Sequence, residues 1–259
     1  RGLAPGPASE RKQSPPPCTG VVPLRPPATL VLAYRFFAPL TVMTVLTMGS
    51  STIVHAALAR LEQPRIALAA FAVAMSFHGA LGGPIWATPF LAMSVVRDRR
   101  SLRQLLRFLA WLMLPLGLVD LLVAFTPFGT WLYGTLLGAS DEVVRQARWA
   151  TLILFAEFPL VALRSTALGL IMLNRRTEAV PITTALRVAS LVAALALLPL
   201  WLEGAIAGAA AFIACIVLET AWMLRIAWPA YRALPPGAEP PPGYGELWRF
   251  GWPLMASQV

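Results

Sequence analysis

Charged residues are scarce in this sequence. Only 13% of its 259 residues are Asp, Glu, Lys or Arg, whereas soluble domains carry about 25%. Hydrophobic residues make up 58% of the chain, and the mean hydropathy is +0.68. This composition excludes disorder over most of the length and argues against an ordinary soluble enzyme. A globular protein whose helices are all buried is the alternative to a membrane protein.

Cysteine and histidine are also rare, with two of each. Cys18 lies in a Pro-rich segment and Cys215 in an apolar run, which excludes a disulfide framework and a thiolate metal site. His55 and His78 lie in different apolar stretches, and the sequence shows no zinc-type spacing and no Gly-rich phosphate loop. We therefore expect no cofactor, no resident metal and no catalytic residues.

Long apolar runs fill most of the chain. Residues 1–30 are rich in proline and are predicted to be a disordered cytoplasmic tail. Residues 31–232 contain six apolar stretches, each near or above the roughly 20 residues with which a helix crosses about 30 Å of hydrocarbon. Because lipid cannot satisfy an open backbone, these stretches must be helices. The sequence predicts an all-α polytopic membrane protein with a six-helix bundle, whose spans are 36–57, 66–96, 105–128, 149–173, 182–201 and 205–228.

The basic residues are distributed unevenly between the two ends of these spans. If the N-terminus is cytoplasmic, fifteen lie on that side, including the cluster in 97–107, and four lie outside. The outside residues are Arg60, Arg65, Arg145 and Arg148. This bias predicts a cytoplasmic N-terminus in the plasma (inner) membrane. It also explains the net charge of +9 without nucleic acid and argues against a seven-helix receptor, which has its N-terminus outside.

Several residues predict where the helices bend, begin or pack closely. Pro84 should bend the second span, and Pro159 should free the carbonyl of Phe155 and bend the fourth. Ser140, followed by two acidic residues, should cap the start of the fourth helix outside the membrane. Gly204 and Gly208 should let a neighbouring backbone approach the sixth span.

A short motif repeats after 214 residues. The segment Tyr34-Arg35-Phe36-Phe37-Ala38-Pro39-Leu40 opens the first span, and Trp248-Arg249-Phe250-Gly251-Trp252-Pro253-Leu254 follows a Pro-rich linker at 233–245. Both read aromatic-Arg-Phe-x-x-Pro-Leu. Parallel repeats of six helices build several transporter folds. We therefore expect residues 246–259 to begin a second, truncated half-bundle, and the chain to be a fragment. Packing of Trp252 and Pro253 back into the first six helices, without a symmetric relation to the first span, would argue against this.

Further motifs occur in the same order as in one transporter superfamily. They are Pro39-Leu40, Ala59-Arg60-Leu61 with Ala69-Ala70-Phe71, and Leu137-Gly138-Ala139-Ser140-Asp141-Glu142-Val143. From Tyr34 to Val259 the sequence resembles multidrug and toxic compound extrusion (MATE) transporters of the multidrug/oligosaccharidyl-lipid/polysaccharide (MOP) flippase superfamily. Gly83-Pro84 followed by Arg97-Asp98-Arg99 is similar to the progressive ankylosis protein-like subgroup.

The resemblance implies twelve helices in two six-helix bundles around a central cavity, with alternating access. In the subgroup it implies export of small anions such as pyrophosphate, ATP or citrate. Drug exporters of the family commonly carry a membrane-embedded acid in the first helix. Residues 36–57 contain none, so the resemblance does not extend to that acid.

Apart from Arg107 and Arg225, which are counted with the cytoplasmic arginines, five charged residues lie within the predicted spans, where each needs a partner or a water-lined cavity. Arg187 and Glu219 lie at matching depths and are predicted to form an interhelical ion pair. Arg164 is the leading candidate for contact with an anionic solute, and Glu157, seven residues earlier, either carries a proton or balances Arg164. Asp120 is expected at the outer interface, where water can hydrate it.

His78 is interpreted as a hydrogen-bonded core residue, with a proton relay as the alternative. The candidate substrate or coupling-ion residues are therefore Asp120, Glu157, Arg164, Arg187, Glu219 and His78.

Together these features favour a secondary transporter or flippase that exports a solute, either a small organic or phosphate-type anion or a drug-like compound. Its expected partners are the lipid bilayer, the solute, a proton or sodium gradient and the second half-bundle. The alternative is a membrane-embedded lipid-linked sugar or acyl transferase.

Overall fold

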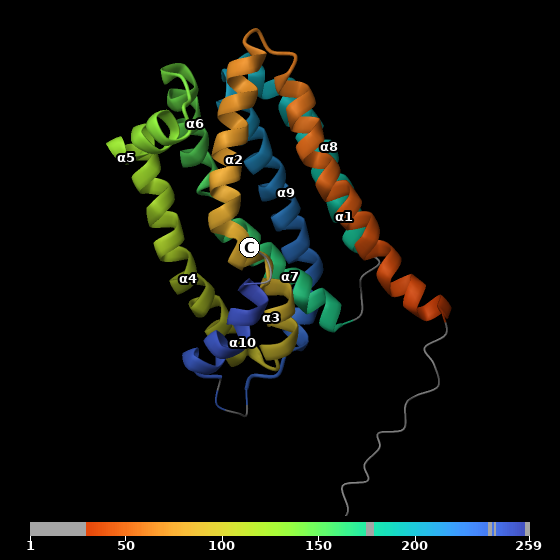
Figure 1. The fold of residues 1–259 in the computed structure, drawn as a ribbon. Helices are drawn as coiled ribbons and strands as arrows, with labels where there is room; N and C mark the ends of the chain where they lie inside the picture. Colours follow the sequence, from red (N-terminus) through yellow and green to blue (C-terminus); the bar gives the residue numbers. More distant parts are fainter. Residues whose placement is uncertain (1–29, 175–178, 238–239, 241, 257–259) are drawn as a thin grey trace, which may run out of the picture.

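The computed structural model describes residues 30–174, 179–237, 240 and 242–256, and within this part the chain is helical (Figure 1). The predicted tail at 1–29 lies outside the described residues, as do Arg175 and Arg176. The elements are α1 (Leu30–Leu58), α2 (Pro64–Trp86), α3 (Thr88–Val95), α4 (Arg99–Phe125), α5 (Pro127–Thr130), η1 (Trp131–Leu136), α6 (Asp141–Leu154), α7 (Glu157–Leu173), α8 (Val180–Leu197), η3 (Leu198–Leu200), α9 (Gly204–Ala233) and α10 (Tyr244–Ala256).

Six helical segments of the described chain are long and apolar enough to cross a membrane, as predicted. They are Phe37–Leu58, Pro64–Val95, Arg99–Phe125, Asp141–Leu173, Val180–Leu200 and Gly204–Ala233. Large apolar side chains along the outside of α4 are exposed at helical spacing, namely Trp111, Leu114, Leu118 and Leu122. A helix face that is exposed to water normally carries polar side chains. A continuous apolar face without a protein neighbour therefore fits contact with lipid hydrocarbon.

Two of the six spans are broken into shorter helices. The second divides at Ala87, between Pro84 inside α2 and Pro89 in the first turn of α3. The bend predicted at Pro84 therefore lies three residues further along, where two prolines flank the break. The fourth span divides after Leu154, and α7 begins at Glu157. Pro159 has no N–H to offer the Phe155 carbonyl, so the break predicted there is confirmed.

The starts of the helices are fixed by different devices. Asp98 caps α4 by accepting from the N–H groups of Arg100 and Ser101, and the Ser101 hydroxyl accepts from the Asp98 N–H in return. Helix α6 begins at Asp141, as predicted. The predicted cap itself is wrong, because Ser140 is extended but its side chain makes no capping hydrogen bond.

Gly204 allows α9 to start against α6. Its φ of +54° is a conformation that other residues adopt only with strain. The Gln146 side-chain oxygen lies beside it and accepts from the Ala205 N–H at 3.1 Å. A Cβ at Gly208 would lie 3.2 Å from Leu58. Both predicted glycines therefore mark close approaches, but the neighbouring atoms belong to side chains rather than to a backbone.

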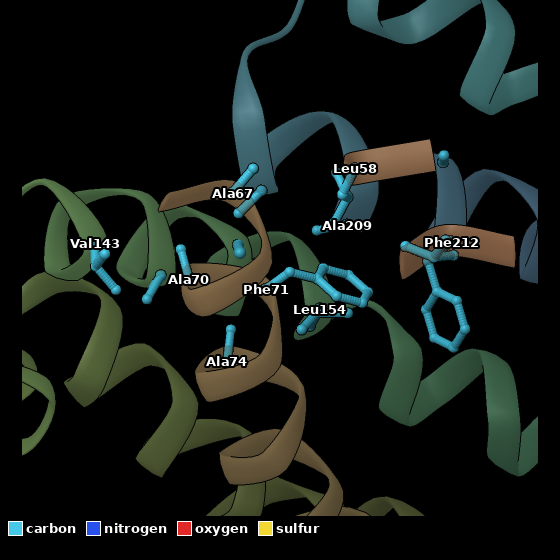
Figure 2. Packing of buried hydrophobic residues seen from close by; sticks show 14 of the residues in the cluster. Leu58, Ala67, Ala70, Phe71, Ala74, Val143, Leu154, Ala209 and Phe212 are labelled. Carbon is cyan, nitrogen blue, oxygen red and sulfur yellow. The ribbon is translucent and has the colours of Figure 1, made fainter. Parts of the chain in front are cut away.

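The largest apolar core joins α1, α2, α6, α8 and α9. Figure 2 shows the Phe71 ring beside Leu154, with Ala70 and Ala74 on the same helix, α2. Small residues such as these let helices approach closely and maximise dispersion contacts, which matter because lipid supplies no hydrophobic drive between spans. A second core joins α3, α4, α7 and α10. Leu160 of α7 also packs against the first core, so α7 contacts both cores.

Helix α10 packs against α2, α3 and α4 (Figure 1). Leu247, Gly251 and Met255 are buried on this side of the helix, whereas Trp252 is 57% exposed and Pro253 is also exposed. Trp252 and Pro253 thus face away from the six spans, while the opposite side of α10 packs against the spans. The described part of the linker docks on the start of α4, where the Pro235 carbonyl accepts from the Arg99 N–H at 3.1 Å.

The arginine-rich end of the bundle is formed by the α3–α4 turn, the end of α9 and α10 (Figure 1). It carries the arginines of 97–107 together with Arg232 and Arg249. The opposite end carries the α1–α2 turn, α5, η1 and the start of α6. The fold therefore separates the basic residues as the sequence predicts.

Candidate functional site

The six predicted site residues form two buried clusters inside the bundle. We call His78, Asp120 and Glu157 the imidazole cluster, and Arg164, Arg187 and Glu219 the guanidinium cluster. Helix α7 contributes one residue to each, Glu157 and Arg164.

In the imidazole cluster, a histidine lies between two carboxylates from different helices. Nδ1 of His78 on α2 lies 2.7 Å from Oδ2 of Asp120 on α4, and Nε2 lies 3.3 Å from Oε2 of Glu157 on α7. The His78 ring stacks on Phe158 with a centroid distance of 4.3 Å. Both ring nitrogens therefore face acids, but only the Asp120 contact is a hydrogen bond, since Oε2 of Glu157 has no hydrogen-bond partner among the described residues.

Asp120 lies about five residues before the end of α4 that is opposite the arginine-rich turn, as predicted, but it is fully buried at 0% exposure, so its predicted hydration is wrong. Helices α2 and α6 pack against α4: His78 of α2 contacts Asp120, and Arg148 of α6 donates to the Ala124 carbonyl at 2.9 and 3.1 Å. Packing by neighbouring helices therefore buries Asp120.

Glu157 contacts His78 rather than Arg164. Two residues separated by two helical turns share a face but lie too far apart to pair directly. The α6–α7 break places Glu157 in the first turn of α7, beside α2. It also lines a cavity of about 120 Å³ together with His78, Gly79, Gly82 and Trp86.

In the guanidinium cluster, one carboxylate is shared by two arginines. Nη1 of Arg164 donates to both oxygens of Glu219 at 3.3 Å, and Nη1 of Arg187 donates to Oε2 at 3.4 Å. The predicted Arg187–Glu219 ion pair is thus present. Arg164, predicted to be less easily neutralised, joins the same acid, and the cluster carries a net charge of +1.

The surroundings of this cluster leave donor capacity unused. The Nε atoms of Arg164 and Arg187 are buried and have no hydrogen-bond partner among the described residues. The Arg187 guanidinium lies 5.4 Å from the Phe212 ring centroid, a favourable cation–π distance. The Glu219 side chain is 0% exposed, that of Arg187 is 5% exposed and that of Arg164 is 17% exposed. Arg164 is therefore the member most accessible to a ligand.

Sequence reasoning missed the link between His78 and Asp120. One signal could have revealed it: each is an isolated ionisable residue surrounded by apolar residues within its span. A lone polar group in an apolar helix needs a partner on another helix. The forty-two positions between them give no local pattern that would connect them.

Comparisons with protein families, curated proteins and solved structures found no match to this chain. The two clusters, which place six ionisable side chains inside an apolar bundle, are the features of this chain that bear on its function.

Proposed function

We propose that this chain is the first half-bundle of a secondary transporter that moves an anionic solute across the plasma membrane by alternating access, with its N-terminus in the cytoplasm. The observation that carries the proposal is the guanidinium cluster, in which two arginines share one carboxylate in the apolar interior. An uncompensated positive charge in a membrane-embedded bundle is costly unless an anion can reach it.

Arg164 is the group assigned to the solute. Its guanidinium is the more exposed of the two and retains an unpartnered Nε. Guanidinium groups form strong charge-assisted bonds with carboxylate and phosphate oxygens. Arg187 and Glu219 then act as positioning residues that hold the Arg164 side chain in place.

The architecture supports a two-bundle transporter. Six spans precede a Pro-rich linker, and a further helix with the repeated motif follows at the arginine-rich end. An even number of spans between the two copies of the motif preserves their orientation, as a parallel repeat requires.

The test uses the full-length protein in proteoliposomes. Uptake of labelled citrate, pyrophosphate and ATP is measured for the wild type, Arg164→Gln and Arg164→Lys. We expect transport of at least one anion, with Arg164→Gln reducing it by about 10-fold or more, since a hydrogen bond to a charged group contributes roughly 1.5–3 kcal/mol. Arg164→Lys should retain part of the activity.

Arg145→Gln is the matched control, because Arg145 is 61% exposed in its side chain at the opposite end of the bundle from the arginine-rich turn. It should transport like the wild type. Equal transport of every anion by Arg164→Gln would remove Arg164 from the site, and no transport of any of the three by the wild type would count against the proposed solute class.

A further inference from the structure

The geometry points to the imidazole cluster as a proton-binding site, in which Glu157 exchanges a proton with the cavity beside Trp86 while Asp120 and His78 remain a charge-balanced pair. This inference rests on the proposed transport function and deepens it by naming the coupling ion. It involves residues other than the guanidinium cluster.

Charge balance limits the states that the cluster can occupy. With the imidazole protonated and both acids ionised, a net charge of −1 is buried among α2, α4 and α7. Binding one proton to either acid gives a neutral cluster, which costs far less in an apolar interior. The cluster therefore alternates naturally between two states that differ by one proton.

Glu157 is better placed than Asp120 to exchange that proton. The Asp120 side chain is 0% exposed and lies 2.7 Å from Nδ1 of His78, whereas Glu157 is 12% exposed and lies 3.3 Å from Nε2. Of the two acids, Glu157 lines the cavity of about 120 Å³ and Asp120 does not. The shorter contact keeps the Asp120–His78 pair together, and the looser one leaves Glu157 free to gain or lose its proton.

The break between α6 and α7 supplies the second element of the site. Glu157 is the first residue of α7, where the free N–H groups and the positive end of the helix dipole stabilise an anion. Burial acts in the opposite direction by stabilising the protonated acid. Both effects act on Glu157 at the position where it lines the cavity.

The other titratable groups around the cluster leave this assignment intact. Tyr133 of η1 is one of these groups. Burial, together with the negative charge of Asp120, raises the pKa of Tyr133 to about 12, so its hydroxyl stays neutral at physiological pH. Its hydroxyl bonds to Thr151 of α6 at 2.8 Å. From α9, the buried Cys215 thiol donates to the Phe212 carbonyl at 3.0 Å. From α1, His55 packs against Phe71 on α2.

A proton explains this donor set better than a sodium ion. Sodium binding would require several oxygen ligands around one position, as hard cations do. Here an imidazole separates the two carboxylates and engages both through its nitrogens. The coupling-ion alternatives therefore differ in a measurable way.

The experiment measures proton binding directly on the full-length protein in lipid nanodiscs, by infrared difference spectroscopy of the protonated carboxyl C=O stretch between acidic and alkaline pH. We expect a carboxyl band in the wild type that disappears on alkalinisation. Glu157→Gln should lack this band, because the amide is nearly isosteric and cannot ionise. The matched control is Glu62→Gln, an exposed acid in the α1–α2 turn, which should keep the band.

Replacing sodium by choline should leave the band and its pH dependence unchanged. An unaltered band in Glu157→Gln, or a band that responds to sodium rather than to pH, would overturn the inference. If Glu157→Gln fails to fold, Glu157→Asp tests the same point, because its carboxyl band should remain but shift in pH dependence; an unshifted band would assign the signal to another acid.

Transport assays separate this inference from the proposed function. A wild type that shows the Glu157 band but moves none of the anions would contradict the anion transporter and leave the proton site in place. The other outcome is that the wild type transports anions equally well with and without a pH gradient, and that Glu157→Gln does the same. This would contradict proton coupling at Glu157 and leave the proposed transport function in place.

Discussion

The two buried clusters differ in whether their charge can change. An imidazole and two carboxyl groups can each gain or lose a proton near neutral or mildly acidic pH once their surroundings permit it. A guanidinium stays protonated in proteins. The guanidinium cluster is therefore a fixed positive charge, suited to hold an anion, whereas the imidazole cluster has a charge that follows the protons available to it. Helix α7 joins the two, which offers a route for coupling them.

Removing the shared carboxylate should have the largest effect on stability. Glu219→Gln leaves two buried guanidiniums without an acid, and breaking a buried pair in this way costs about 3–5 kcal/mol. The arginines cannot relieve this cost by losing protons. We expect the midpoint of denaturant-induced unfolding in a membrane mimetic to fall sharply.

The double variant Glu219→Gln with Arg187→Met serves as the control for this prediction. It removes one of the two unpaired charges and should recover part of the lost stability. If Glu219→Gln unfolded at the wild-type midpoint, the two guanidiniums would have found other partners. That result would contradict the claim that Glu219 balances a fixed positive charge in this cluster.

Asp120→Asn should have a smaller effect, although Asp120 is as deeply buried as Glu219. The loss is about 1.5–3 kcal/mol, the contribution of a hydrogen bond to a charged group. The physical reason for the difference is that His78 can release its proton when its partner is neutralised. The same unfolding assay measures the change, repeated at two pH values on either side of neutrality.

A double-mutant cycle with His78→Gln checks that the two residues act together. If Asp120 stabilises the fold through His78, the double variant should be less destabilised than the sum of the single variants. Strict additivity, or a loss in Asp120→Asn as large as in Glu219→Gln, would contradict the proposed difference between the clusters.

Features that depend on span length and on proline were predictable from the sequence. The six spans follow from apolar runs of about 20 residues or more, and the division of the fourth span follows from the missing N–H of Pro159. The Arg187–Glu219 contact was predictable because both residues lie near the same end of neighbouring spans, at matching depths.

What the sequence could not provide is the rotation of one helix relative to another. Both His78 and Asp120 face the interior, but nothing local specifies that they face each other. The burial of Asp120 depends on the packing of α2 and α6 against α4, a tertiary feature without a periodic signature. Arg164 shares Glu219 because its long side chain reaches across to α9, which its position on α7 alone does not reveal.

The smallest effect concerns acid sensitivity outside the membrane-spanning segments, which must be separated from that of the imidazole cluster. The N–H and hydroxyl of Ser101 and the N–H of Arg100 hold the pKa of Asp98 below its ordinary value. The folded state then binds fewer protons than the unfolded state, so the stability contributed by Asp98 is present above about pH 4 and is lost as the pH falls through its folded pKa.

Asp98→Asn keeps an acceptor for the α4 cap, so it should remove only the loss of stability at acidic pH. Asp141→Asn, at the exposed start of α6, is the control and should still lose stability at acidic pH as the wild type does. Unfolding midpoints measured from neutral to acidic pH test this directly. Acid sensitivity that persists in Asp98→Asn but disappears in Glu157→Gln would belong to the imidazole cluster, and the reverse pattern would assign it to the cap.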